Sequence, residues 1–500
     1  MPYNERLGLK QNYENDFKVK SNAQNQSSSQ CGIQTNWQLA NTPKRQPLKP
    51  VNGEYPTDTS QAAAVLESPT KLIDLNYDCL EHIFRGFCLV DLIGIGGTCT
   101  YLQSATCRYF QTKFRKRTVF IDCERFPNYS ISSGAVHQKT NIGSDIEAFM
   151  FVFGAVLSKL AIVNMCPMLQ VDPERLESDA KIQRLIEKYC RNHLREISFR
   201  NCGKLTMNHA QPLEEVVKVS FDHCVLGEKL ANFDYMFPKL KRLDLIDCDV
   251  RGVRRSIEKE FPQLEYLNLN VPLGANSWSE SSFTVANVKA AIDRNPNIKH
   301  LNLRYWNASA YDAKLLKYAA DKLPQLKSLQ LWHMRYTDFW SDGDIRFPSV
   351  QKLVLVNRMQ KLGYLGRNLA ALSFENLRKF SILDQFDTEC TTFVARHKTI
   401  KELCIVPNGE HEWYPSDEDV FRIFTVLPNL ERLLVNGRRM TTKGLIRLIS
   451  KRSKLSAIKV HQYTFSAVVR KLFRWKCTQL AWNVVFSTGS ESEMTVKRRT

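Results

Sequence analysis

One pattern of apolar and polar positions recurs over most of the chain. Three apolar residues and a closing Asn or Cys stand at fixed offsets, L-x-x-L-x-L-x-x-N/C, as in Leu194, Ile197, Phe199 and Cys202. Further copies begin at Val216, Leu240, Leu264, Ile298, Leu326, Val350, Leu377, Ile400, Leu430, Leu455 and Leu480, with an earlier one at Leu157. The twelve copies from Leu194 have a mean spacing of 26 residues. The pattern predicts one short strand per copy, with its apolar positions turned inward.

A spacing of about 20–29 residues is typical of leucine-rich repeats. Such units cannot bury their apolar face singly, so they stack, with the strands lining a concave side. We therefore expect an α/β fold, a leucine-rich-repeat solenoid (horseshoe), over residues 191–486. Cys202, Cys224 and Cys248 then occupy the closing position of successive units, and we expect a structural role for them rather than metal binding.

The pattern changes to a helical one in residues 71–117. Asn76 is a predicted N-cap, and Leu80, Ile83 and Phe84 follow at spacings that put them on one helix face. Three short helices are predicted here. A module of this size has little core of its own, so a partner would stabilise it.

Three other segments lack the repeat. Residues 1–70 are polar and predicted to be disordered, as is a tail at 487–500. Residues 118–190 are expected to form a linker and the N-terminal cap of the array. An apolar run around Phe149 is interrupted by Lys159 and is too short to span a bilayer, so a buried helix followed by a strand is expected.

Charge and cysteine content narrow the class of protein. The formal net charge is +19, of which +16 lies between residues 190 and 486. The 14 cysteines are scattered, without a Cys-x-x-Cys pair, and no signal peptide is visible at the start. We expect reduced thiols and a cytoplasmic and/or nuclear location.

Residues 71–114 resemble an F-box. The matching residues are Leu75, Leu80, Ile83, Phe84, Leu89, Asp91, Leu92, Cys99, Leu102 and Phe110. Together with the repeats, the chain resembles the F-box/leucine-rich-repeat proteins over roughly residues 71–486, with an opening similar to insect members. It departs from the family pattern at Asn76, where proline is usual, and at Gly94, Gly96 and Gly97, which lie where a helix is expected.

The resemblance implies a substrate-recognition subunit of an SCF-type cullin–RING ubiquitin ligase, with the Skp adaptor and a cullin as partners. The F-box would dock on the adaptor through apolar residues, some of which must also form the module's own core. The candidates are Leu75, Leu80, Ile83, Phe84, Leu89 and Leu92. The chain itself would be no enzyme: no catalytic motif, metal site or cofactor is expected.

The repeats would bind the protein substrate on the concave face. Aromatic, basic and amide groups alternate there, and Tyr, Trp and Arg dominate interface hot spots. The candidates are Tyr266, His300, Arg304, Tyr305, Trp332 and His333. An apolar strip of Val354, Val356, Leu383, Val406 and Leu434 follows. The positive charge suggests an acidic or phosphorylated substrate.

Two alternatives remain open. Lys and Arg recur at exposed strand positions, such as Lys218, Lys352 and Lys379. In the first alternative, the basic array binds nucleic acid or another anionic partner independently of a ligase. We consider nucleic acid unfavoured, because such charges also keep an apolar sheet in solution, and no membrane partner is expected. The third interpretation is a scaffold protein that needs no adaptor.

Overall fold

The structure is a computed structural model. It describes residues 71–499 except for residues 115–116, 125–128, 134–135, 144, 165–172, 206–210, 228–231, 251–253, 271–283, 305–310, 333–344, 357–368, 384–387, 407–414, 452–453, 463–464 and 487–492. The chain divides into two compact units, Met1–Ser68 and Pro69–Thr500. The segment 1–70, predicted to be disordered, lies outside the described residues.

The second unit begins with the three predicted helices. After a 3-10 turn, η1 (Leu72–Asp74), come α2 (Tyr77–Phe84), α3 (Leu89–Gly96) and α4 (Thr100–Phe114). Asn76 caps α2 as predicted, because its Oδ1 accepts a hydrogen bond from the backbone N–H of Cys79 at 2.9 Å. Gly94 and Gly96 lie within α3. We call residues 72–114 the helical module.

The segment 118–190, expected to form a linker and the N-terminal cap of the array, contains the first strands of the sheet. It contains β1 (Val119–Asp122), β2 (Tyr129–Ser133), β3 (Val136–Gly143), α5 (Ile146–Phe153), a second 3-10 turn η2 (Gly154–Val156), β4 (Lys159–Val163) and α6 (Pro173–Cys190). β3, β2 and β1 pair antiparallel, and β1 pairs in parallel with β4. The apolar run around Phe149 is a buried helix, α5, followed by β4, as predicted. No helix in the described part of the chain is long and apolar enough to cross a membrane.

From β4 onward, twelve strands pair in parallel in the order in which they occur along the chain. After β4 they are β5 (Glu196–Arg200), β7 (Lys218–Asp222), β9 (Arg242–Ile246), β10 (Tyr266–Asn270), β11 (His300–Arg304), β12 (Ser328–Trp332), β14 (Lys352–Val356), β16 (Lys379–Leu383), β17 (Glu402–Ile405), β18 (Arg432–Asn436) and β19 (Ala457–His461). Two minor parallel pairs lie outside this sheet: β6 (Lys204–Leu205) with β8 (Val225–Leu226), and β13 (Ile345–Arg346) with β15 (Leu372–Ser373).

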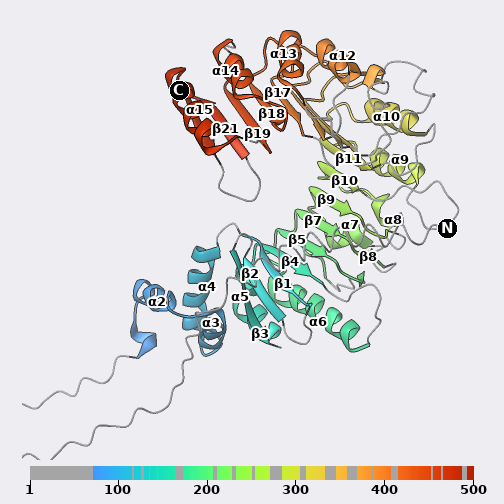
Figure 1. Ribbon diagram of the computed structural model, residues 1–500. Helices are drawn as coiled ribbons and strands as arrows, with labels where there is room; N and C mark the ends of the chain where they lie inside the picture. Colours follow the sequence, from blue (N-terminus) through green and yellow to red (C-terminus); the bar gives the residue numbers. More distant parts are fainter. Residues whose placement is uncertain are drawn as a thin grey trace, which may run out of the picture. The chain divides into compact units, whose positions relative to one another are not determined.

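The connections between these strands carry helices, which lie along one face of the sheet (Figure 1). They are α7 (Phe233–Met236), α8 (Arg254–Ile257), α9 (Val285–Arg294), α10 (Tyr311–Lys322), α12 (Thr388–Arg396), α13 (Asp417–Val426), α14 (Thr442–Lys451) and α15 (Ala467–Gln479). We call the opposite side of the sheet the open face.

The register follows the sequence pattern. The second and third apolar positions of each copy, such as Leu243 and Leu245 on β9, are buried toward the helices and align with their counterparts on the next strand. A shift by one residue would turn this whole apolar set to the open face, so burial specifies the register. The predicted α/β class is therefore confirmed as a mixed structure with a long, mainly parallel sheet, which has 17 strands among the described residues.

The C-terminal end of the sheet differs from the prediction. β21 (Glu493–Arg498) lies between β19 and β20 (Trp482–Phe486) and pairs antiparallel with both. The copy assigned to Leu480 is therefore not a further parallel unit, and residues 493–498 of the expected disordered tail form a strand. The reason is that Met494 and Val496 alternate with polar residues and are fully buried, which gives this short segment one apolar face.

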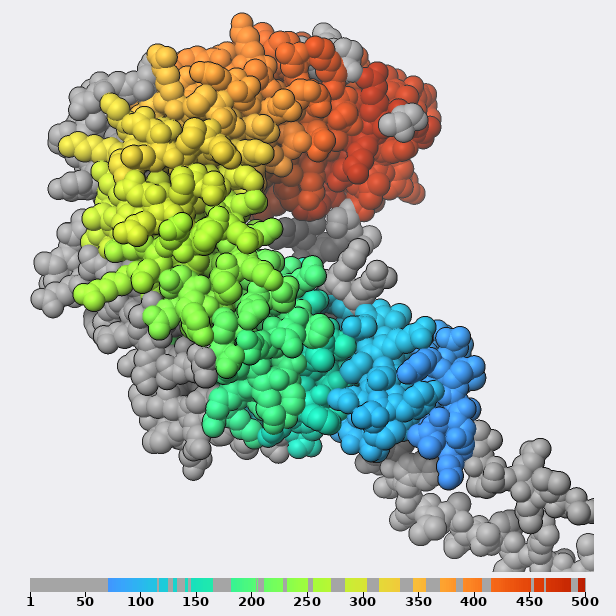
Figure 2. Space-filling model, turned by 180° about the vertical axis from the view of Figure 1, so that it is seen from behind, coloured from blue at the N-terminus to red at the C-terminus, as the bar shows by residue number. Residues whose placement is uncertain are grey.

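The helical module and the start of the sheet share one core. The Phe110 ring lies 4.4 Å from that of Phe153 and 6.2 Å from that of Phe149, between ring centroids. The Cys107 thiol donates to the Val152 carbonyl at 2.9 Å, which adds a polar link between α4 and α5. In Figure 2 the module and the first strands form one continuous surface. Shared packing of this kind holds the module in a defined orientation on the sheet.

Candidate functional site

The open face carries a polar and aromatic cluster on β9, β10 and β11. Tyr266 and His300 are paired in register on β10 and β11, and their rings lie 5.7 Å apart. The Arg242 guanidinium lies 3.8 Å from the centroid of the Tyr266 ring, within the range of a cation–π contact. Two of the predicted substrate-binding residues therefore lie side by side, with an arginine that the sequence analysis did not assign to this surface.

Arg242 is held in place by a buried carboxylate. It donates from Nε and Nη2 to Asp244, at 2.7 and 3.1 Å, and Asp244 is only 3% exposed. The same carboxylate accepts a hydrogen bond from Asn268 Nδ2 at 3.1 Å. A bidentate pair of this kind fixes the guanidinium plane against Tyr266. Asp244, in the middle of β9, therefore orients Arg242 at the start of the same strand. Arg242 in turn contacts Tyr266 on β10.

The charge around His300 is positive. Burial lowers the pKa of His300 below its usual value, and Lys352 and Lys327 contribute in the same direction. Burial also lowers the pKa of Lys352, with Lys379 adding to the effect. The imidazole is therefore neutral near pH 7, and an anionic group bound here would be favoured by the surrounding cations.

Of the other four predicted residues, the structure describes the side chain of Trp332 alone. Trp332 is half-buried at the opposite end of β12 and is aligned in register with Arg304 at the end of β11. The side chain of Arg304 is outside the described residues, as are Tyr305 and His333. Among the predicted side chains that the structure describes, Tyr266 and His300 are therefore brought together, and Trp332 is not beside them.

The predicted apolar strip is mostly covered. Val354 and Val356 are buried, at 8% and 2% exposed, and Leu383, Val406 and Leu434 are half-buried. They offer little of the exposed apolar area that a contact patch needs.

The recurring basic residues of the strands are largely paired with acids of neighbouring strands. Glu196 binds Lys159 at 2.5 Å and Lys218 at 3.4 Å. Glu402 binds Lys379 at 3.1 Å and Arg432 at 2.9 Å. These pairs run across the sheet because residues aligned in register lie close enough to interact. A continuous stripe of free cations, as the nucleic-acid alternative requires, is therefore not present in this part of the described chain.

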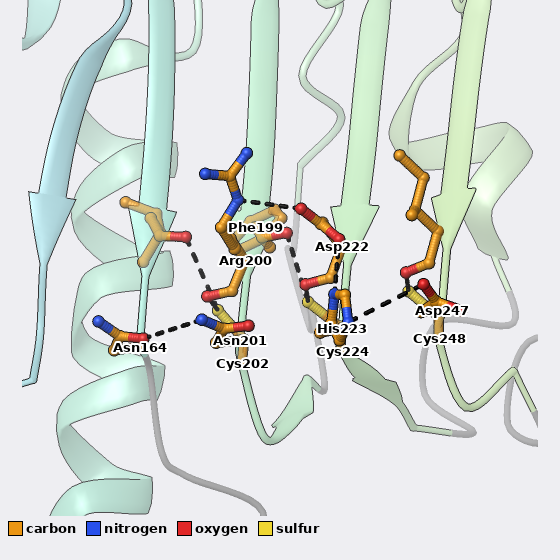
Figure 3. A network of polar contacts seen from close by, with 12 residues as sticks. Asn164, Phe199, Arg200, Asn201, Cys202, Asp222, His223, Cys224, Asp247 and Cys248 are labelled. Atoms are coloured by element: carbon orange, nitrogen blue, oxygen red, sulfur yellow. Dashed lines mark hydrogen bonds and ion pairs between the residues drawn. The ribbon is translucent and has the colours of Figure 1, made fainter. Parts of the chain in front are cut away.

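A repeated turn follows β4, β5, β7 and β9 (Figure 3). Asn164, Asn201, His223 and Asp247 all have positive φ, between 48° and 59°. Each donates its backbone N–H to the carbonyl of the last residue of the next strand, at 2.8–2.9 Å. Asn, Asp and His adopt this left-handed conformation more readily than other non-glycine residues. A short polar residue directly before each ladder cysteine is the sequence signal that could have identified this turn.

The ladder cysteines have the predicted structural role. Cys202, Cys224 and Cys248 are buried, and each thiol donates to the carbonyl two residues before it, at 3.3, 3.3 and 3.2 Å (Figure 3). Burial raises the pKa of Cys248 well above that of a free thiol. No group of three or more potential metal ligands occurs among the residues that the structure describes.

The helical module separates the predicted adaptor-binding residues into two groups. Leu80, Phe84 and Leu92 are at most 1% exposed and form the core of the module, so they are not available at its surface. Ile83 is exposed, and Leu75 and Leu89 are half-buried.

Two exposed apolar residues of the module were not predicted. Ile73 on η1 and Val90 on α3 are 50% and 46% exposed. Val90 directly follows the predicted Leu89, and Ile73 lies two residues before the predicted Leu75; only the packed structure shows which of these side chains face outward.

The chain was compared with known proteins. It matches no protein-family model, and it matches no curated protein.

Proposed function

We propose that this protein is the substrate-recognition subunit of an SCF-type cullin–RING ubiquitin ligase. In this proposal the helical module is an F-box that docks on the Skp adaptor. The parallel strands form a leucine-rich-repeat solenoid that presents a protein substrate. The chain carries no catalytic group of its own and contributes proximity and orientation to a reaction performed by other subunits.

The observation that carries the proposal is the outward apolar surface of the helical module. Ile73, Ile83 and Val90 are exposed, with Leu75 and Leu89 half-buried. Full burial of one such side chain is worth about 1.5–3 kcal/mol, so three or four of them are enough to anchor a helix-in-groove contact. Three exposed apolar side chains within one small helical module support a partner-binding role for it.

The rigid junction supports the same function. A ligase receptor must hold its substrate at a defined distance from the adaptor, because a loosely tethered substrate gains little effective concentration. The packing of Phe110 against α5 gives the module a defined position relative to the first strands. The cluster of Arg242, Tyr266 and His300 is then the site where we place an acidic or phosphorylated substrate segment.

The test is affinity purification of the full chain with Ile73, Ile83 and Val90 each changed to Asp. These residues are exposed, so the substitutions leave the module's core intact. We expect the wild-type chain to retain the Skp adaptor and cullin, and the triple variant to lose both. Tyr235→Asp, at a residue that is 56% exposed on α7, is the matched control and should retain them. If wild type and triple variant carry equal amounts of adaptor, or neither carries any, the proposal fails.

A further inference from the structure

The positive charge of the chain is concentrated near the C-terminal end of the sheet. No Asp or Glu occurs between Glu431 and Glu491, whereas 13 Lys and Arg residues do. This acid-free segment forms β18, α14, β19, α15 and β20. Arg432 and Lys459 pair with Glu402 and Glu493 on neighbouring strands, but the segment itself supplies no acid, and so it accounts for most of the excess charge.

Within this segment, α15 has an outward apolar ridge. Val468, Leu472 and Trp475 follow one another at i, i+4 and i+7, and are 68%, 61% and 60% exposed. The opposite side of the helix is buried through Phe473 and Cys477. The ridge therefore points directly away from the sheet. In the described part of the chain the ridge stays exposed, since a helix needs only one buried face to pack.

Basic residues flank the ridge on both sides. Helical geometry places Lys471 and Arg474 along one side of it and Lys476 along the other. Among the described residues, no acid forms an ion pair with any of these three; Lys476 donates only to Gln479 Oε1, at 3.3 Å. On the neighbouring helix α14, Lys443 and Arg447 are also exposed. On α13, the carboxylate of Asp417 is already engaged, because it accepts hydrogen bonds from the backbone N–H and the hydroxyl of Thr441.

We propose that the ridge of α15, with its flanking cations, docks on an anionic lipid bilayer. The ridge is a single apolar row bordered by cations, which is the arrangement that an interfacial helix presents to an anionic bilayer. Trp, Leu and Val enter the interfacial layer while Lys and Arg remain at the level of the phosphates. The charged side chains along the ridge are all cations, which complements the uniformly negative surface of an anionic bilayer. The proposal goes beyond the ligase function and does not depend on it.

The test is co-sedimentation of the full chain with large vesicles, either of phosphatidylcholine alone or with about 30% phosphatidylserine. We expect binding to the anionic vesicles only, weakening as the salt concentration rises. Leu472→Ser with Trp475→Ser should reduce the partition at least about ten-fold, because each buried apolar side chain contributes more than that factor. The matched control, Tyr235→Ser with Val485→Ser, removes two other exposed apolar side chains and should bind like wild type.

A second pair of variants separates local attraction from net charge. Lys471→Glu with Arg474→Glu should abolish binding, whereas Lys314→Glu with Lys317→Glu on α10 changes the net charge equally and should leave most of it. Equal losses in the two charge variants, or no effect of the Leu472 and Trp475 changes, would overturn the proposal. So would binding of soluble poly-glutamate through these residues without binding of vesicles, which would assign the surface to an acidic protein. The variant in Ile73, Ile83 and Val90 should still bind vesicles, which keeps this result separate from the ligase function.

Discussion

Gly96 lies at a close approach between α3 and the two helices packed beside it. A Cβ at this position would lie 2.6 Å from Val152 Cγ1 and 2.7 Å from Thr106 Oγ1, whereas a Cβ at Gly94 would meet nothing within 4 Å. The first glycine is therefore needed for packing of the helical module against α5. The second only reduces helix propensity. Helix propensity alone makes the two glycines equally unfavourable in α3.

These two glycines make a matched prediction. Gly96→Ala should destabilise the unit by about 1–2 kcal/mol, because Val152 and Thr106 must shift in a packed core. Gly94→Ala, on the exposed side of the same helix, should stabilise it by about 0.5–1 kcal/mol. Urea unfolding of both variants measures the two values. Changes of the same sign would contradict the packing described for α3, α4 and α5.

His223 provides a pH-dependent contact in the repeated turn that follows β7. Its Nδ1 lies 2.7 Å from Asp222 Oδ1, and its Nε2 lies 3.9 Å from Asp247 Oδ2. The hydrogen bond with Asp222 raises the pKa of His223 above its usual value; burial opposes this, and both carboxylates add to it. A raised native pKa means that the protonated ring stabilises the fold. That contribution is complete below the unfolded-state pKa of about 6.5 and is lost as the pH rises through the native value.

We therefore expect His223→Asn to destabilise the protein more at pH 5.5 than at pH 9. Asn accepts the positive φ of this turn, so the backbone should remain intact. The side chain is 52% exposed, so solvent screening limits the difference to about 0.5 kcal/mol. Urea unfolding at the two pH values measures it. In an Asp222→Asn background the pH dependence of the substitution should shrink, and an equal effect at both pH values would refute the assignment.

At the scale of elements, β21 closes the sheet where the repeats end. It covers the edge of β19 by antiparallel pairing and brings Glu493 to Lys459 and His461, at 2.9 and 2.7 Å. The hydrogen bond with Lys459 lowers the pKa of this carboxyl. A parallel repeat array needs such an ending, because an unpaired strand edge invites association.

Met494→Ala should destabilise the protein by about 2–5 kcal/mol, because the side chain is fully buried. Lys497→Ala, an exposed position on the same strand, should change the stability by less than about 0.5 kcal/mol. Unfolding curves and amide exchange across β19 and β20 would show both. If both substitutions are silent, β21 does not contribute to the folded unit.

The helices and strands differ in how far they could be predicted. The strands of the copies that begin at Leu240, Leu264 and Ile298, and the N-cap at Asn76, follow from local patterns, and the structure has them. β21 was missed because its pattern spans only six residues and differs from the repeat. Its partner strands lie on either side of it only after the chain has turned back between β20 and β21.

At the scale of the whole unit, the distribution of charge changes the view of possible partners. The recurrence of Lys and Arg suggests a long anionic-binding stripe. Cross-strand pairs at Glu196 and Glu402 neutralise much of it, and the unpaired cations lie around α15 instead. Composition alone does not separate these arrangements, since ion pairing depends on which strands become neighbours.

The sequence by itself determined the apolar rows, the order of the parallel strands from β5 to β19 and the buried cysteines, because a repeat of fixed spacing has one way to bury its apolar positions. Only the tertiary structure decided which apolar residues remain outside. Leu80 and Ile83 share a helix face in the sequence pattern, yet packing against α4 buries the first and leaves the second exposed. Likewise, Asp244 holds Arg242 against Tyr266, which lies beside His300, across strands that are about 24 to 34 residues apart in the chain. Exposure and pairing depend on neighbours that are distant in the chain, and local patterns do not specify these contacts.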